Sequence, residues 1–201
     1  MSPRKQGNGA RQADGDTRGV ARLAQQAADG TLLYETKNPL PEDTRAQAVR
    51  LLNHRLADCV DLQSQCKQAH WNVKGSQFIG LHKLFDEIYE AVGEYVDLIA
   101  ERVVQLGGIA EGTVRVASER SSLAEYPLVI SSGEEHVAAL SDVLGRFSGK
   151  AREAIEELEE MGDPDSMDIL TEVSRGVDQW LWFVEAHQQT RPVSTQARSK
   201  G

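Results

Sequence analysis

The sequence predicts an all-α protein built on a four-helix bundle with one long crossover between the second and third helices. Apolar residues recur every three or four positions in four segments of about 25 residues each, which is the period of an amphipathic helix. The first and third connections are short, whereas the second spans roughly 25 residues and is expected to cross the molecule. No strand pattern competes convincingly, and the best candidate for a short extended piece is TVRVAS, residues 113–118.

We expect the first helix to begin at Pro41 and to end near Asn72, since Gly75 suits a left-handed stop. Its inward-facing stripe follows a spacing of three to four residues: Val49, Leu52, Leu56, Cys59, Gln63, Cys66 and His70. The two cysteines are seven residues apart, which is about 10 Å along a helix axis and too far for a disulfide. We interpret Cys59 and Cys66 as small buried apolar residues.

The second helix is expected to run from about Phe78 to Leu106, where Gly107 and Gly108 end it. Its predicted core stripe again has helical spacing: Leu81, Leu84, Ile88, Val92, Tyr95, Ile99, Val103 and Leu106. The segment that follows, residues 107–133, forms the long crossover.

Start signals mark the last two helices. Ser132 and Glu135 form an S-x-x-E capping box before a stripe that predicts the third helix: Val137, Leu140, Leu144, Phe147, Ala151, Ile155, Leu158 and Met161. Asp163 can cap the fourth helix, and Pro164 suits its first position. This helix ends before Pro192 and presents a final apolar set: Leu170, Val173, Val177, Trp180 or Leu181, and Val184.

Short first and third connections with a long second one define the ferritin-like version of the four-helix bundle. The periodicity by itself is equally compatible with a plain structural bundle. We expect the bundle to occupy residues 41–190, between a flexible basic N-terminal tail, residues 1–40, and a flexible basic C-terminal tail, residues 191–201.

Charge is distributed unevenly along the chain. The net charge is −9, yet residues 1–22 carry +3 and residues 188–201 carry +3, so the middle carries about −15. Basic tails can bind DNA without sequence preference, but they can also serve only to solubilise, and the acidic body repels DNA. No apolar run is long enough for a membrane span or a signal peptide. We therefore expect a cytoplasmic protein, associated with the nucleoid if the tails bind DNA.

A second stripe on the second helix carries metal-ligating side chains. His82 and Asp86 are four residues apart, as are Asp97 and Glu101. Residues i and i+4 of a helix lie about 6 Å apart on one face, so each pair can bind one metal ion. Asp86 and Asp97, however, are roughly 16 Å apart along the axis, and metal–ligand bonds measure only about 2 Å. One ion cannot contact both pairs of the same chain.

Two copies of the helix, antiparallel across a two-fold axis, remove this difficulty. The first pair of one copy then faces the second pair of the other, and the axis passes near residues 91–92. Gly93 lies close to that axis, where a small residue permits close approach. The ligand stripe is turned by about 100° from the core stripe, because Leu81 and His82 are adjacent, so it can face a second molecule.

His70 joins this set, because it lies in the last turn of the first helix, on its inner stripe, and the short NVKGSQF connection returns the chain to His82. Two imidazoles and three carboxylates suit iron, manganese or zinc better than calcium or a thiolate-bound metal. Taken singly, His70 is more typical of a partly buried structural histidine, and Asp97 with Glu101 is typical of a solvated acidic face. Only the joint spacing, H-x11-H-x3-D-x10-D-x3-E, favours a metal site.

At these positions the sequence closely resembles the Dps family, the small ferritin-like DNA-protection proteins of starved bacterial cells. The resemblance is carried by HWNVKGSQFIGLHKLFDEIYEAVGEYVDLIAERVVQLGG at residues 70–108, AEYPL at 124–128 and LWFVE at 181–185, and it covers about residues 40–190.

The resemblance implies a hollow homo-dodecamer of tetrahedral symmetry with di-iron ferroxidase centres at its two-fold interfaces. It assigns His70, His82 and Asp86 to one subunit and Asp97 and Glu101 to its mate, as catalytic and metal-binding residues. Fe(II) would be oxidised there by hydrogen peroxide or O2, and the Fe(III) product stored as mineral, which protects DNA from oxidative damage. Family members admit iron through acidic pores, for which Asp163, Asp165 and Asp168 are candidates by location.

Two neighbouring residues and the competing functions remain open from the sequence alone. Lys67 can pair with a ligand carboxylate or remain solvated, and Trp71 can quench oxidising equivalents or simply pack. Besides a ferroxidase and iron store, the sequence is compatible with a nucleoid-binding architectural protein whose iron chemistry is secondary. A metal-stabilised bundle without turnover is the third alternative.

Overall fold

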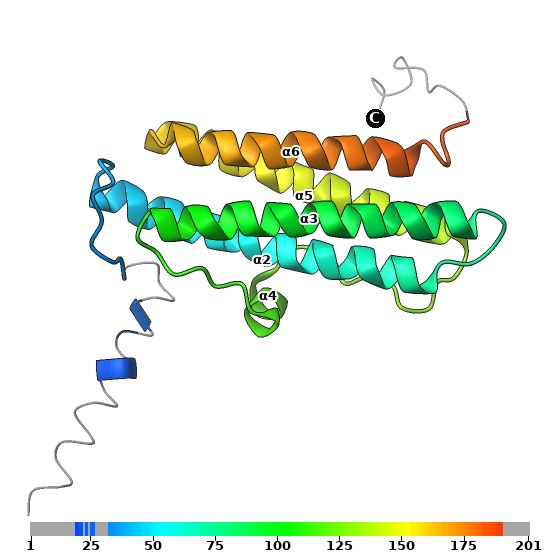
Figure 1. The fold of residues 1–201 in the computed structure, drawn as a ribbon, viewed down its shortest axis with the longest axis horizontal. Helices are drawn as coiled ribbons and strands as arrows, with labels where there is room; N and C mark the ends of the chain where they lie inside the picture. The colour runs from blue at the N-terminus through cyan, green and yellow to red at the C-terminus, as the bar shows by residue number, and fades with distance from the viewer. Residues whose placement is uncertain (1–18, 22, 24, 27–31, 191–201) are drawn as a thin grey trace, which may run out of the picture.

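Four long helices lie side by side in a computed structural model of the chain, which describes residues 19–21, 23, 25–26 and 32–190 (Figure 1). They are α2 (Glu42–Asn72), α3 (Phe78–Gln105), α5 (Gly133–Met161) and α6 (Pro164–Glu185). A short helix, α4 (Val114–Arg120), interrupts the connection between α3 and α5. None of the described helices is long and apolar enough to cross a membrane.

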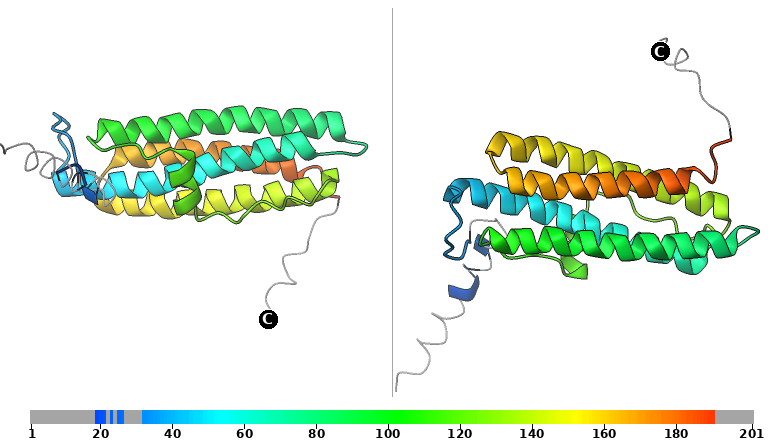
Figure 2. Two further views of the ribbon diagram at one scale, coloured as in Figure 1. Left: turned by 90° about the horizontal axis from the view of Figure 1, so that it is seen from below. Right: turned by 45° about the horizontal axis from the view of Figure 1, so that its top comes forward.

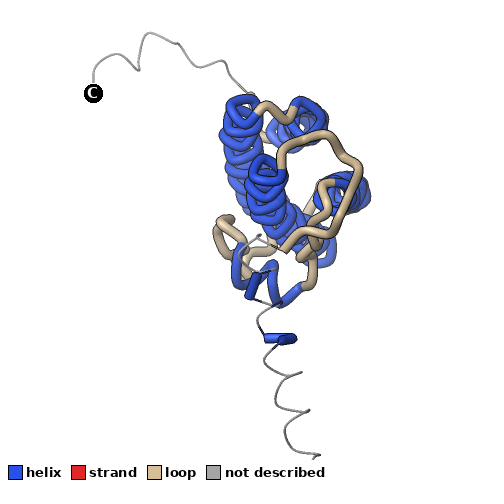
Figure 3. The backbone as a smooth tube through the Cα atoms, turned by 90° about the vertical axis from the view of Figure 1, so that its left-hand side faces the viewer, coloured by secondary structure: helices blue, strands red, loops and turns tan. Residues whose placement is uncertain are grey.

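The order and direction of the helices are those of the ferritin-like bundle. Figure 1 shows α2 and α3 as one antiparallel pair and α5 and α6 as another, and Figure 3, which looks along the bundle, shows the helices gathered side by side. The connection from α3 to α5 runs along the bundle beside α2 (Figure 2, left). The predicted all-α fold with its long second crossover is therefore confirmed.

Local signals explain where the helices begin and end. The Ser132 hydroxyl accepts a hydrogen bond from the backbone N–H of Glu135, whose carboxylate accepts one from the backbone N–H of Ser132, so the predicted capping box is present. Asp163 caps α6 from its side chain, and Pro164 is its first residue. Gly107 has a φ of 86°, a left-handed conformation that glycine adopts without strain.

The core lies where the predicted stripes meet. Most of the predicted inward residues are fully buried, and Phe85, which the stripe of the second helix omits, is also 0% exposed. Leu84 and Tyr95 are only partly buried at its margin. Cys59 and Cys66 are free and buried, as predicted, and burial raises the pKa of Cys66 to about 12. Burial also raises the pKa of Cys59, so the reactive thiolate form is disfavoured in both side chains.

The extended piece expected at residues 113–118 is wrong, because this stretch lies in α4 and its N-cap. A strand needs a partner for its backbone hydrogen bonds, and the described part of the chain holds no strand beside it, whereas a helix satisfies these groups internally. Ala117 is the one buried residue of α4, while Val114 is 79% exposed. The alternating valines therefore do not mark a buried strand face.

Polar residues of α2 hold the crossover in place. Asn53 donates to the carbonyl of Ile109 at 3.0 Å and accepts from the N–H of Glu111 at 3.0 Å. Asp58, which is 0% exposed, accepts from the N–H of Ser122 at 2.6 Å. The helix is thus buried on two sides, against the bundle core and against the crossover.

The predicted tails lie largely outside the described residues. Residues 191–201 and most of residues 1–31 are not described, so their expected flexibility and DNA binding stay predictions. The last part of the predicted N-terminal tail, residues 32–40, lies against the bundle, where Leu33 and Leu40 pack on the core. The Tyr34 N–H donates to the carbonyl of Gly107 at 2.7 Å.

Candidate metal centre

The two predicted histidine ligands lie against each other where α2 ends and α3 begins. The rings of His70 and His82 stack with centroids 3.7 Å apart. His70 Nδ1 lies 2.7 Å from the carbonyl oxygen of His82, and His82 Nδ1 lies 2.8 Å from that of His70. The connection between α2 and α3 is short, so it brings these two turns together. It is held to the end of the crossover by a hydrogen bond from the Lys74 N–H to the carbonyl oxygen of Ser131.

This reciprocal arrangement determines which ring nitrogens can bind metal. A carbonyl oxygen only accepts hydrogen bonds, so each Nδ1 that faces one carries the hydrogen. The remaining nitrogen, Nε2, then keeps its lone pair in the neutral ring. Histidine ligands in proteins are commonly oriented in this way, by donating the other ring N–H to a carbonyl or carboxylate. His70 and His82 can therefore each offer an Nε2 lone pair to a metal ion.

Asp86 lies beside the histidines, one turn after His82. Its carboxylate accepts a hydrogen bond from Lys67 of α2 and lies 3.8 Å from His70 Nδ1. The Lys67 ammonium, with weaker contributions from the two imidazoles, lowers the pKa of Asp86 below its ordinary value. The ion pair predicted as one of two alternatives for Lys67 is confirmed, and it keeps Asp86 an anion that a cation can bind.

Asp97 and Glu101 lie farther along α3, and both are exposed. The structure brings His70, His82 and Asp86 together and leaves this second pair apart from them. Among the described residues of one chain, no group of three or more histidine, cysteine, aspartate or glutamate side chains is arranged to hold a metal ion. A complete set of five ligands therefore does not form within one chain.

Three neighbours of the predicted site differ from expectation or were missed. Trp71 is 67% exposed, so the packing role expected for it is not fulfilled within one chain. Phe78, missed in the sequence, contacts the His82 ring with centroids 5.0 Å apart, and its i, i+4 spacing from His82 was the available signal. A Cβ on Gly93 would lie 2.7 Å from Gln63 Nε2, so this glycine makes room for a side chain of its own chain.

Asp163 is not available as a pore residue. It is 0% exposed, caps α6 and accepts a hydrogen bond from Arg102 Nη2 at 2.7 Å. Arg102 also donates to Ser166 at 2.8 Å. Asp165, whose side chain is 79% exposed, and Asp168 remain on the surface. A buried and paired carboxylate cannot attract ions from solvent, so the candidate pore set reduces to these two.

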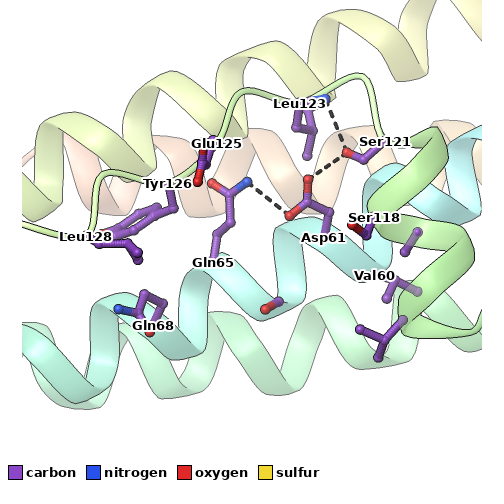
Figure 4. A pocket seen from close by; sticks show the side chains of 13 residues that line it. Val60, Asp61, Gln65, Gln68, Ser118, Ser121, Leu123, Glu125, Tyr126 and Leu128 are labelled. Carbon is purple, nitrogen blue, oxygen red and sulfur yellow. Dashed lines mark hydrogen bonds between the residues drawn. The ribbon is translucent and has the colours of Figure 1, made fainter.

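A separate groove of 560 Å³ lies between α2, α4 and the crossover. Figure 4 shows its polar wall, where Gln65 and Ser121 both donate to the Asp61 carboxylate. None of the five predicted ligands lines it. Its one exposed acid, Glu125, has no neighbouring histidine among the lining residues, so the groove does not offer the nitrogen and oxygen ligands found at the histidine pair.

Comparisons with known proteins agree with this fold. The sequence matches the ferritin-like domain over residues 49–191. It is 42% identical over 158 residues to the DNA protection during starvation protein of Agrobacterium fabrum, an alignment that covers 79% of this chain and 98% of that protein. The fold is similar to DpsA14 from Streptomyces coelicolor, with a TM-score of 0.76 and 29% identity over 81% of this chain and 98% of that one. It is also similar to Dps from Microbacterium arborescens in the high iron form, with a TM-score of 0.71 and 32% identity over 78% and 100% of the two chains.

Proposed function

The chain belongs to the Dps family of ferritin-like proteins, and we propose that it oxidises Fe(II) with hydrogen peroxide or O2 and stores the Fe(III) product as mineral. Consuming iron and peroxide together would protect DNA from oxidative damage. The observation that carries this proposal is the His70–His82 pair, whose Nδ1 atoms face carbonyl oxygens and whose Nε2 atoms are free to bind a metal. The high iron form of the Microbacterium arborescens relative supports iron as the metal.

The proposed centre is shared between two copies of the chain. His70, His82 and Asp86 come from one copy, and Asp97 and Glu101 come from its mate, because the two groups are too far apart along α3 to contact one ion. A two-fold axis creates two such centres at once. The wider assembly would be the family's hollow homo-dodecamer, with the mineral inside.

The ligand set suits the proposed reaction. Two Fe(II) ions supply the two electrons that reduce one hydrogen peroxide, with two protons, to two water molecules, so no hydroxyl radical is released. Carboxylates stabilise Fe(III) more than Fe(II), which favours oxidation at the site. Five side chains are few for two ions, so we expect one iron to be held firmly and the other loosely. Lys67 would position Asp86 and keep its carboxylate ionised until iron binds.

Fe(II) oxidation by the purified protein tests the proposal. The variant His82→Ala/Asp86→Ala removes two ligands and is expected to slow oxidation, with peroxide and with O2, while the assembly keeps its size. Glu87→Ala is the matched control, because Glu87 is an exposed acid on the same helix outside the ligand stripe. Unchanged oxidation in the double variant would eliminate the ligand set, and a protein that binds iron without oxidising it would be a metal-stabilised bundle.

DNA binding is a second candidate function, favoured by the basic ends of the sequence and by the name of the Agrobacterium fabrum relative. Each phosphate that a lysine or arginine neutralises releases a counterion, so the affinity would fall steeply with salt. Many tails on one assembly would add avidity. Gel shifts across a salt series with a tail-deleted variant test it. Binding that survives removal of both tails would refute a tail-based mechanism, and a protein that binds DNA but oxidises no iron would be mainly architectural.

A further inference from the structure

Two large apolar side chains on α3 project into solvent next to the proposed ligands. Ile79 is 61% exposed and Val104 is 58% exposed. Neither belongs to the core cluster, to which the inward face of α3 contributes other apolar side chains. Ile79 precedes His82 by three residues, and Val104 follows Glu101 by three. Both side chains therefore lie on the ligand stripe and mark its two ends.

The positions of these residues are symmetric about the proposed axis. The point midway between Ile79 and Val104 lies between residues 91 and 92, which is also the midpoint of the two ligand pairs. An antiparallel copy of α3 that aligns the ligands therefore also aligns Ile79 with Val104 of its mate. A self-complementary pattern of this kind fits a second copy of the same helix, which meets both ends of the stripe at once.

The surface around Val104 has the shape that such a contact needs. A hollow of 450 Å³ is lined by Ala100, Glu101, Val104, Gln105 and Ala110. Three of these five side chains are small or branched apolar groups, so its floor can receive one apolar side chain. Glu101, a proposed iron ligand, forms part of its rim. A side chain that fills the hollow would therefore lie directly beside the metal centre.

We propose that Ile79 of each copy inserts into this hollow of its partner and contacts Val104. The contact fixes the register in which His82 and Asp86 face the second ligand pair, and it covers the outer end of each iron centre against water. The proposed contact rests on the proposed function, because the alignment of the two helices is deduced from the positions of the proposed ligands. Exposed apolar side chains that become buried at both ends of a seam would stabilise the pair without using any ligand.

Disulfide trapping tests this contact. In the variant Ile79→Cys/Val104→Cys, the new cysteines of one chain are about 37 Å apart along the helix, so they cannot pair within it. The native Cys59 and Cys66 are buried, and burial raises the pKa of both thiols, so they give no background. Mild oxidation should yield covalent dimers on a denaturing gel, and reduction should remove them. Each single variant should remain monomeric on the same gel.

The matched control is Ile79→Cys/Glu94→Cys, which places the second thiol on an exposed position about 15 Å from Val104. It should give no covalent dimer. An Ile79→Cys/Val104→Cys variant that stays monomeric on the gel, although it keeps the native size of the wild type, would overturn the contact. Fe(II) oxidation by the wild type separates the two claims: oxidation without trapping would refute only the contact, and trapping without oxidation would refute only the proposed function.

Discussion

His70 and His82 hold each other in place, because each ring stacks on the other and each Nδ1 faces the other's carbonyl oxygen at 2.7 or 2.8 Å. The orientation of each imidazole thus depends on the backbone of the helix that carries the other histidine. The pair is organised without a metal, so the proposed metal binding would not have to order two flexible side chains. The NVKGSQF connection is the sequence feature that makes this possible.

The first prediction concerns the Nε2 atom of His82. His82→Phe keeps an aromatic ring against His70 but removes the ligand nitrogen, so we expect the affinity for Fe(II) to fall by about tenfold or more. Anaerobic titration with Fe(II) in a calorimeter measures this affinity. His54→Phe, an exposed histidine elsewhere on α2, is the control and should bind as the wild type does. Equal affinities in all three proteins would exclude His82 as a ligand.

The second prediction concerns the buried pair between Arg102 and Asp163. Asp163→Ala leaves the Arg102 guanidinium buried without its carboxylate and removes the cap of α6. Breaking a buried ion pair costs about 3–5 kcal/mol of unfolding free energy. Asp165→Ala removes an exposed carboxylate 3.8 Å from the same arginine and should cost less than about 1 kcal/mol. Denaturant unfolding compares the two variants, and similar losses would contradict the burial argument.

The third prediction concerns the pH dependence of stability. His136 is 1% exposed and lies 2.6 Å from the Tyr126 hydroxyl through Nδ1, and burial lowers its pKa below the ordinary 6.5. Since protonation then favours the unfolded chain, the stability contribution is complete above pH 6.5 and declines as the pH falls below it. His136→Gln keeps an acceptor for Tyr126 but cannot titrate.

Thermal unfolding between pH 7.5 and 5 measures this effect. The wild-type midpoint should fall more steeply than that of His136→Gln across this range. The titratable groups that face His136 are Tyr126, Glu135 and Lys74; burial raises the pKa of Tyr126, and hydrogen bonds from Ser132 lower that of Glu135, so both pKa values move away from this range. Parallel curves for the two proteins would show that His136 does not resist protonation in the folded state.

The residues that the sequence predicts well are those whose structure is set locally. The Ser132–Glu135 capping box and the Asp163 cap each depend on four consecutive residues, so their pattern is readable without the fold. The meeting of His70 with His82 follows from a connection too short to separate them. For these features, the local sequence pattern and the loop length are sufficient for a correct prediction.

Other features depend on contacts that no local pattern encodes. The α4 helix is wrongly predicted as an extended piece, because its valines alternate although no strand among the described residues pairs with it. The pairing of Lys67 with Asp86 joins two helices and depends on side-chain orientation, so the sequence leaves it open. Asp97 and Glu101 lie apart from the histidines in the one chain described, so the completion of the centre by a second copy stays a proposal.

Complementation between two inactive variants tests the shared centre most directly. We use two double variants, His82→Ala/Asp86→Ala and Asp97→Ala/Glu101→Ala. An assembly made from either variant alone has no centre with all five proposed ligands. A mixed pair, however, has one centre with all five native ligands and one with none of the four. With random pairing in co-expressed protein, half of the pairs are mixed, so about a quarter of the centres are intact. We predict that Fe(II) oxidation recovers to about that fraction of the wild-type rate. No recovery in co-assembled protein would contradict a centre built from two chains.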